Sequence, residues 1–278
     1  MKCFTLNNGV KMPAMGLGTF SMSRFALLRV VCQAVKTENG GYSSFDTAAA
    51  YGNERWLGLG QKFCKKQRKE IFLTTKLSNT QQRIGNVGEA LERSLALLRT
   101  SYVDLYLMHW PNPETYVDSW LQMETLYKKG LARAIGVCNF HQHHLEKLIK
   151  VATVLPAVNQ FEMHPLLSQK ELLNFCKSKG IQVCAYSPVA RMHKDLIENP
   201  ILVALARKHC KTVNQIIFRW DYQCGAIAIP KTSKVERLRE NINIFDFELS
   251  NEEMVAIDSI NRDFRVRHNP DHCDFSKL

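Results

Sequence analysis

The chain has 278 residues, a formal net charge of +11 and nine cysteines. Single β/α barrels reach this length, so we expect one domain over residues 1–278. An odd number of cysteines without a C-x-x-C pair is typical of reduced packing thiols and favours a cytoplasmic protein. The start of the chain lacks an apolar run of about 7 to 15 residues, and no apolar stretch reaches about 18, so neither export nor membrane spanning is expected.

The positive charge could indicate an anionic partner such as nucleic acid. Lysines and arginines are, however, scattered among acidic residues along the whole chain. The densest basic run, residues 65–69, is more typical of a solvated helix end than of a nucleic-acid surface. We therefore expect no nucleic-acid partner.

Residues 4–12 alternate around Asn8-Gly9, which predicts a hairpin closed by a type I′ turn. Short runs of strand character then alternate with amphipathic helical patterns. The predicted strands cover residues 15–19, 43–47, 71–76, 103–109, 133–138, 157–162, 182–186 and 226–229. The predicted helices cover residues 24–38, 53–66, 83–99, 116–129, 141–151, 169–179, 197–222 with a break near 210–212, and 234–243.

A further helix over residues 251–261 and a C-terminal tail lie outside this repeat. Three of the helix starts carry the S-x-x-E pattern of a capping box, beginning at Ser168, Ser233 and Ser250. Eight strand–helix units fit a closed (βα)8 TIM barrel, although a doubly wound open sheet also alternates strands with helices.

Polar residues at the strand ends separate these two folds, because chemistry in such barrels gathers where strands end and loops to helices begin. Seven of the eight predicted strands end on such residues, namely Asp46, Lys76, His109, Cys138-Asn139, Gln160 to Glu162, Tyr186-Ser187 and Lys231-Thr232. The fold that we expect is therefore an α/β TIM barrel with an N-terminal β-hairpin and an extra C-terminal helix and tail.

The residues at three of these strand ends suggest a site in which a tyrosine acts as a general acid. Asp46, Lys76 and His109 would come together at neighbouring strand ends, and Tyr51 would reach over from the following loop. Lowering a phenol from its usual pKa of about 10 to near 7 takes about 4 kcal/mol, which one ammonium at about 4 Å and an effective dielectric of about 20 can supply. Asp46 would keep Lys76 charged, and His109 would orient a substrate carbonyl.

The motifs around these residues are specific as a set. They comprise residues 8–13 with Gly16 to Thr19, residues 45–54, Lys76, residues 108–111, 136–140, Asn159-Gln160 ahead of 162–165, 185–188, and 229–232 with Arg237, Glu240 and Asn241. Through them the chain resembles the aldo-keto reductase family over nearly its whole length. Within that family it is most similar to small microbial reductases of the diketogluconate and methylglyoxal type.

This resemblance implies a barrel that reduces small aldehydes or ketones, such as methylglyoxal or keto-sugars, with NADPH. The implied catalytic residues are Asp46, Tyr51, Lys76 and His109, with Tyr51 protonating the carbonyl oxygen. Phe20 and Trp110, just beyond strand ends, are expected to line the substrate pocket beside Tyr51 and His109. The expected protein is a monomer.

The nicotinamide end of the cofactor site is also implied by the resemblance. Asn139 and Gln160 would hold the carboxamide, with Cys138 in place of the usual serine. Tyr186 would stack on the nicotinamide ring, and Ser187 would touch the pyrophosphate. The expected cofactor-binding residues in the first strand are Gly18 and Thr19.

At the other end, the resemblance implies that Lys231, Thr232 and Arg237 bind the 2′-phosphate, with Glu240 and Asn241 near the adenine. The local chemistry agrees, because the start of a helix next to basic residues is a natural phosphate site.

Three alternatives were weighed. Residues 16–18 lack the third spaced glycine of a dinucleotide fingerprint, and no tyrosine is followed four residues later by lysine, which disfavours other nicotinamide enzymes. His141, His143 and His144 have no glutamate at metalloprotease spacing, so no metal site is expected. An NADPH-binding regulatory or structural protein with little turnover stays open as the alternative function.

Overall fold

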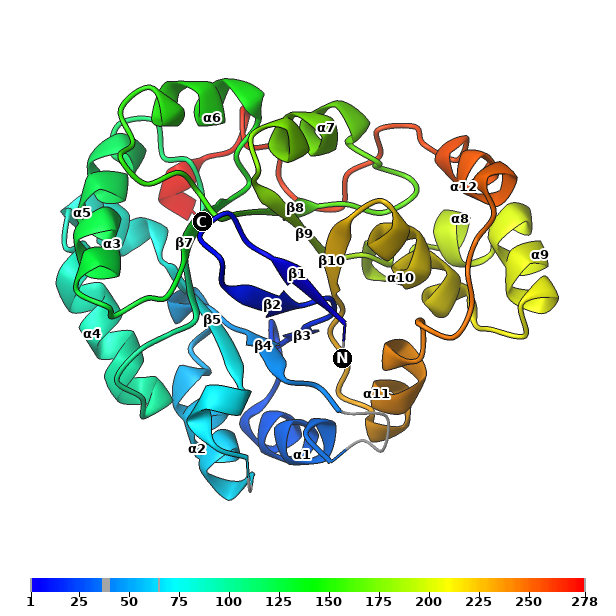
Figure 1. Ribbon diagram of the computed structural model, residues 1–278, viewed down its shortest axis with the longest axis horizontal. Coiled ribbons are helices and arrows are strands. Elements are labelled where there is room, and N and C mark those ends of the chain that lie inside the picture. Colours follow the sequence, from blue (N-terminus) through cyan, green and yellow to red (C-terminus); the bar gives the residue numbers. More distant parts are fainter. Residues whose placement is uncertain (1, 37–40, 65, 278) are drawn as a thin grey trace.

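The structure is a computed structural model that describes residues 2–36, 41–64 and 66–277. Within these ranges, eight parallel strands form one sheet in the order β10-β9-β8-β7-β6-β5-β4-β3. The amides of Gly16 and Gly18 donate to the carbonyls of Ala228 and Pro230, both at 3.0 Å, so the first strand of the sheet meets the last. The predicted TIM barrel is confirmed (Figure 1).

Seven of the eight strands lie within the ranges expected for them, and β5 is the exception. The strands are β3 (Leu17–Gly18), β4 (Ser44–Asp46), β5 (Phe72–Leu77), β6 (Leu105–Met108), β7 (Ile135–Cys138), β8 (Val158–Glu162), β9 (Gln182–Tyr186) and β10 (Ala226–Ile229). Strands buried on both faces read as short apolar runs, which is why the sequence marks them clearly. Only β5 extends one residue beyond its predicted end.

The helices surround the barrel (Figure 1). They are α1 (Arg24–Ala34), α2 (Glu54–Phe63), α3 (Asn79–Ile84), α4 (Val87–Leu98), α5 (Tyr116–Lys128), α6 (Gln142–Ile149), α7 (Lys170–Ser178), α8 (Lys194–Ile197), α9 (Pro200–Lys208), α10 (Val213–Gln223), α11 (Val235–Ile242) and α12 (Asn251–Asp258). The predicted helix 83–99 is divided, because Gly85 with φ 75° ends α3. Residues 37 and 38 of the first predicted helix lie outside the described residues.

The predicted N-terminal hairpin is present, with β1 (Cys3–Thr5) antiparallel to β2 (Lys11–Pro13). Its turn differs from the expected type I′ turn. The Gly9 amide donates to the Leu6 carbonyl, and in this loop only Gly9, with φ 83°, is left-handed. The connection is therefore a three-residue loop with glycine in the left-handed position, which also suits a hairpin. In Figure 1 the hairpin lies across one end of the barrel.

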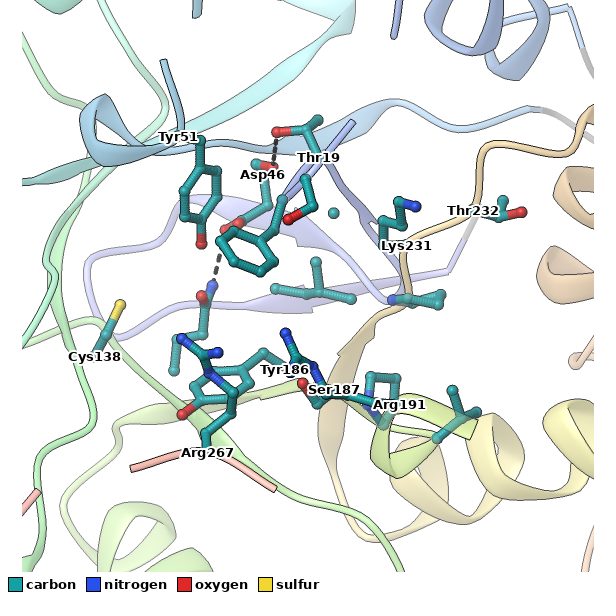
Figure 2. A pocket seen from close by; sticks show the side chains of 18 of the residues that line it. Thr19, Asp46, Tyr51, Cys138, Tyr186, Ser187, Arg191, Lys231, Thr232 and Arg267 are labelled. Carbon is teal, nitrogen blue, oxygen red and sulfur yellow. Dashed lines mark hydrogen bonds between the residues drawn. The ribbon is translucent and has the colours of Figure 1, made fainter. Parts of the chain in front are cut away.

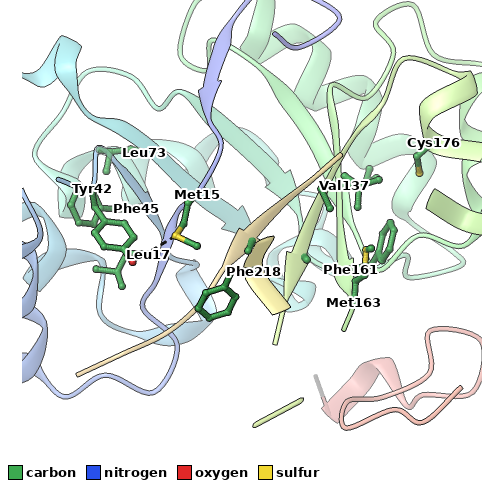
Figure 3. Close-up of a cluster of buried hydrophobic side chains, with 14 of the residues drawn as sticks. Met15, Leu17, Tyr42, Phe45, Leu73, Val137, Phe161, Met163, Cys176 and Phe218 are labelled. Carbon is green, nitrogen blue, oxygen red and sulfur yellow. Dashed lines mark hydrogen bonds between the residues drawn. The ribbon is translucent and has the colours of Figure 1, made fainter. Parts of the chain in front are cut away.

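Side chains of alternate strand residues pack into two different hydrophobic cores. Leu105 and Leu107 of β6 belong to the interior of the barrel, which Leu6 and Met12 of the hairpin close. Tyr106 belongs to the layer between barrel and helices, part of which Figure 3 shows around Met15, Phe45, Phe161 and Phe218. The barrel interior is thus filled at the hairpin end, which leaves the opposite end for a site.

Two of the three predicted capping boxes are wrong. The Ser250 hydroxyl accepts a hydrogen bond from the Glu253 amide, and the Ser250 amide donates one to the Glu253 carboxylate, as predicted for α12. In contrast, α7 begins after Gln169 and α11 after Lys234, neither with a side-chain cap. The pattern fails at Ser168 and Ser233 because each helix starts one residue later than the pattern requires.

Other expectations concern charge, thiols and membranes. In the basic run, Lys65 lies outside the described residues, and Arg68 is not a solvated helix end because it pairs with Asp104 at 2.8 Å. None of the nine cysteines, all within the described residues, forms a disulfide bond. Among the described helices, none is long and apolar enough to cross a membrane.

Candidate active site

A cavity of 710 Å³ lies where the strands end. Sixteen of the predicted site residues line it, namely Gly18, Thr19, Phe20, Asp46, Tyr51, His109, Trp110, Cys138, Asn139, Gln160, Tyr186, Ser187, Lys231, Thr232, Arg237 and Asn241. Figure 2 shows ten residues of the cavity wall with their labels, from Tyr51 at one side to Thr232 at the other. Two predicted residues, Lys76 and Glu240, are not part of the wall.

Lys76 lies just beneath the cavity and is 1% exposed. Its ammonium forms an ion pair with Asp46 and donates to the Thr47 carbonyl at 2.8 Å. Burial is the largest single influence and acts to lower the pKa of Lys76, but Asp46, Tyr51 and Cys138 together raise it by more, so the ammonium is retained. The other oxygen of Asp46 accepts a hydrogen bond from Gln160 Nε2 at 2.8 Å. Asp46 therefore joins three strands of the barrel.

Tyr51 lies in a single 3-10 turn, Ala49–Tyr51, that ends at Gly52 with φ 64°. The Lys76 ammonium lies 5.2 Å from the centroid of its ring. Burial raises the pKa of Tyr51 to about 12, and the Lys76 charge opposes this shift without reversing it. The expected pKa near 7 is not found, because the Lys76 charge is shared with Asp46 while the ring is poorly solvated. At neutral pH the phenol carries its proton.

The His109 ring lies 5.7 Å from the Tyr51 ring, edge to face. Burial, together with the positive charges of Lys76 and Arg267, lowers the pKa of His109 to about 3. His109 is therefore a neutral imidazole with one N–H donor at physiological pH. The Phe20 ring, 41% exposed, lies 5.0 Å from the Tyr51 ring, also edge to face. These three rings and Trp110 make one wall of the cavity.

Two of the predicted site residues have left-handed backbones, Asn139 with φ 63° and Ser187 with φ 48°. The strain is offset by side-chain bonds at Asn139, whose amide donates to the His109 carbonyl at 3.0 Å and whose oxygen accepts from the Tyr186 hydroxyl at 2.7 Å. Cys138 is buried, and burial raises the pKa of its thiol, so the sulfur is not a thiolate. Asn139, Gln160 and Tyr186 thus face one region of the cavity.

Basic residues gather at the opposite end. Lys231, Lys234 and Arg237 line the cavity where β10 leads into α11. Thr232 Oγ1 accepts a hydrogen bond from the Lys234 amide at 3.1 Å, which fixes the loop. Asn241 is 4% exposed, and its Oδ1 has no hydrogen-bond partner among the described residues. This end offers cations for phosphate groups and a free acceptor for an amine.

Glu240 is the predicted site residue that the structure places elsewhere. Its carboxylate accepts a hydrogen bond from the Thr212 hydroxyl at 3.1 Å, which ties α11 to the start of α10. The neighbouring residue Asn241 faces the cavity instead, because residues one apart on a helix point in different directions.

Sequence reasoning missed the contribution of the C-terminal tail, which brings Arg267 and His268 into the cavity wall. It also missed Arg191 and Asn79, and the structural use of Asn53, which is 4% exposed and donates to the Thr19 carbonyl at 2.9 Å. No periodicity or motif marks Arg267, His268, Arg191 or Asn79, whereas Asn53 lies inside the motif of residues 45–54 but had no expected role. Glu162 was the one indication of the tail in the sequence, because a carboxylate on a buried strand requires hydrogen-bond partners from elsewhere in the chain.

The histidines at the start of α6 lie beside the tail. Ligand atoms of His141, His144 and Asp271 lie within 4.8 Å of one another. Arg265 donates to His141 Nε2 at 3.2 Å, so the neutral ring carries its proton on Nδ1, which donates to Asp271 at 2.7 Å. His144 Nδ1 accepts from the His141 amide, which places the proton of the neutral ring on Nε2. Hydrogen bonds therefore account for this cluster, and the absence of a metal stays a prediction.

Comparison with known proteins bears on this arrangement. The model of the aldo/keto reductase family matches residues 14–262, which include all the predicted site residues. The chain belongs to the aldo/keto reductase family. This membership accounts for the barrel, for the position of the cavity and for the motifs found in the sequence.

Among relatives in the aldo/keto reductase family, the glyoxal reductase of Bacillus subtilis is 48% identical over 271 residues, which cover 97% of this chain and 96% of that protein. The methylglyoxal reductase DkgA of Salmonella typhimurium is 40% identical and covers 96% of both chains. A crystal structure of a Bombyx mori aldo-keto reductase in complex with NADP matches with a TM-score of 0.91 and 35% identity, covering 97% of this chain and 96% of that one. The resemblance to methylglyoxal-type reductases is confirmed.

Proposed function

We propose that this protein is an NADPH-dependent reductase of small aldehydes and ketones. The observation that carries the proposal is the group of Tyr51, Lys76, Asp46 and His109 at one end of a cavity whose other end is basic. The named activities of the glyoxal and methylglyoxal reductases support small dicarbonyl compounds as substrates.

The cofactor fits the residues of the cavity. Lys231 and Arg237 would hold the 2′-phosphate, since no described carboxylate pairs with either, and the unpartnered Asn241 Oδ1 would accept the adenine amine. Tyr186 and Asn139 would contact the nicotinamide end. When bound, NADPH supplies the hydride for the carbonyl carbon. The complex of NADP with the Bombyx mori enzyme supports this choice of cofactor.

The remaining steps belong to the side chains. His109, held neutral, donates a hydrogen bond to the carbonyl oxygen and orients it toward Tyr51. Tyr51 is protonated at neutral pH and gives its proton to the oxygen as negative charge develops there. Lys76 stabilises the resulting phenolate, and Asp46 keeps Lys76 charged. The raised pKa of Tyr51 agrees with a donor that stays protonated until negative charge develops on the carbonyl oxygen.

Replacing Tyr51 by phenylalanine tests the proton donor. We expect Tyr51→Phe to bind NADPH with unchanged affinity, measured by cofactor fluorescence, and to lose at least about a hundredfold in kcat for methylglyoxal, in line with general acid catalysis. Tyr222→Phe is the matched control, because that ring packs against Phe4 and not in the cavity. Near-normal turnover by Tyr51→Phe would contradict the assignment.

The alternative, an NADPH-binding protein with little turnover, predicts a different result for the wild-type chain. Cofactor fluorescence would change on binding, but no aldehyde in a panel of small carbonyl compounds would be reduced. The intact group of Asp46, Tyr51, Lys76 and His109 argues against this alternative, since cofactor binding alone does not require a protonated phenol beside a buried ion pair.

We further propose that the chain works as one domain and as a monomer in the cytoplasm. The nine free thiols support a reducing compartment. Sedimentation equilibrium at micromolar concentration should give the mass of one chain, 31.9 kDa. A concentration-dependent dimer would contradict the monomer.

A further inference from the structure

Arg267 places an unpaired guanidinium at the substrate end of the cavity. Its Cζ lies 5.5 Å from the centroid of the Phe20 ring, and Phe20 in turn packs against Tyr51. Figure 2 shows the side chain extending from the C-terminal tail into the space bordered by Tyr186. The backbone amide of Arg267 has a partner, but no described carboxylate pairs with the guanidinium.

The tail that carries Arg267 is held firmly. Both oxygens of Glu162, a fully buried residue, accept backbone amides of the tail, from Val266 at 2.7 Å and from Arg267 at 2.9 Å. His164 lies against the same carboxylate at 3.0 Å. A buried carboxylate with three partners fixes the backbone of the tail. Arg267 is therefore aimed into the cavity by the fold and is not a freely moving surface arginine.

The charge of the cavity exceeds what the cofactor requires. Of the described residues in its wall, six are lysine or arginine, and the single acidic one, Asp46, is paired with Lys76. Lys231, Lys234 and Arg237 lie at the end proposed for the 2′-phosphate. Arg267 lies at the other end, close enough to His109 that its charge contributes to the lowered pKa of that ring. Since no described carboxylate pairs with the Arg267 guanidinium at this end of the cavity, the guanidinium favours a ligand that carries a negative charge.

We propose that Arg267 binds a carboxylate of the substrate, so that the preferred substrates are aldehydes carrying a carboxylate about one aromatic ring away from the carbonyl. The spacing follows from Phe20, whose ring centroid lies 5.5 Å from the guanidinium carbon and 5.0 Å from the Tyr51 ring, so that a ligand of about one aromatic ring can reach both. The planar fork of a guanidinium matches a carboxylate with two parallel hydrogen bonds. This inference rests on the proposed reductase function and adds a substrate class to it.

The test compares two aldehydes of nearly equal shape, 4-carboxybenzaldehyde with a negative charge and 4-nitrobenzaldehyde without one. In Arg267→Leu, the ratio of kcat/KM for the carboxylate over the nitro compound should fall at least about tenfold, the value expected for a charge-assisted hydrogen bond. Arg267→Lys should keep part of the ratio. Arg207→Leu, which removes one exposed positive charge from α9, should leave the ratio as in the wild type.

Three results would overturn the proposal. The first is an equal loss for both aldehydes, the second is an unchanged ratio, and the third is a loss of NADPH affinity in Arg267→Leu, which would assign Arg267 to the cofactor. If the wild type reduces neither aldehyde, turnover of methylglyoxal decides the reductase function separately, and the carboxylate site is decided by calorimetric titration of 4-(hydroxymethyl)benzoate into the NADP⁺ complex. Binding that Arg267→Leu weakens at least about tenfold supports the site, and equal binding refutes it.

Discussion

Replacing Asp46 by asparagine would show how much the site depends on one buried ion pair. The substitution keeps the shape of the side chain but removes the negative charge beside Lys76. What remains for the ammonium is the Thr47 carbonyl at 2.8 Å. Removing one partner of a buried ion pair costs about 3–5 kcal/mol, because the other charge is left uncompensated. We expect Asp46→Asn to lower the free energy of unfolding by that amount near pH 6.

The cost should depend on pH in a defined direction. Without Asp46, burial dominates and the pKa of Lys76 falls below its ordinary value. The folded variant then binds fewer protons than its unfolded chain, so its stability rises as the pH increases toward about 10. Urea unfolding followed by circular dichroism at pH 6 and pH 9 should therefore show a smaller difference from the wild type at pH 9.

A double-mutant cycle provides the control. Lys76→Met with Asp46→Asn removes both charges, and we expect the double variant to be more stable than Asp46→Asn alone. The reasoning would be refuted by a loss below about 1 kcal/mol in Asp46→Asn at pH 6, or by losses in the two single variants that simply add.

Three further predictions concern the cofactor, a helix cap and pH. Arg237→Ala should weaken NADPH binding much more than NADH binding, and equal losses in fluorescence titrations would contradict a 2′-phosphate contact. Ser250→Ala should lower the free energy of unfolding in urea by about 1 kcal/mol, and Ser168→Ala should hardly change it, because Ser250 caps its helix and Ser168 does not. Equal effects of the two substitutions would refute this prediction. Burial lowers the pKa of His144 to about 4, so in acid the unfolded chain binds a proton at this histidine at a higher pH than the folded protein does. The free energy of unfolding should therefore fall by about 2–3 kcal/mol as the pH drops from 6.5 to 4.5. His144→Gln should reduce this dependence on pH, and an unchanged dependence would refute the prediction.

Sequence patterns were sufficient for the barrel because each strand is a short buried run and each helix an amphipathic one. They also located most of the cavity wall, since the strand ends converge by geometry once the barrel is known. Asp46 and Lys76 illustrate this, being 30 residues apart in sequence yet paired through neighbouring strands.

What the sequence did not show depends on contacts without a local signature. Glu162 and Val266 are 104 residues apart, and nothing near either residue indicates that they bond. The pKa of Tyr51 could not be predicted because it balances burial against a shared charge, and only coordinates give both quantities. The caps expected at Ser168 and Ser233 failed because a shift of one residue in a helix start is decided by tertiary packing.

The bond between Glu162 and the tail has a consequence for how such an enzyme can diverge. Strand β8 presents Gln160 to Asp46 and, two residues later, Glu162 to the backbone of the tail. Because Glu162 holds main-chain amides, the side chains of the tail can be exchanged by mutation without loosening its attachment. Selection can therefore alter the residues that the tail adds to the cavity wall while the proposed proton-transfer group stays unchanged. A duplicated gene could acquire a new substrate range through changes in a few codons of the tail.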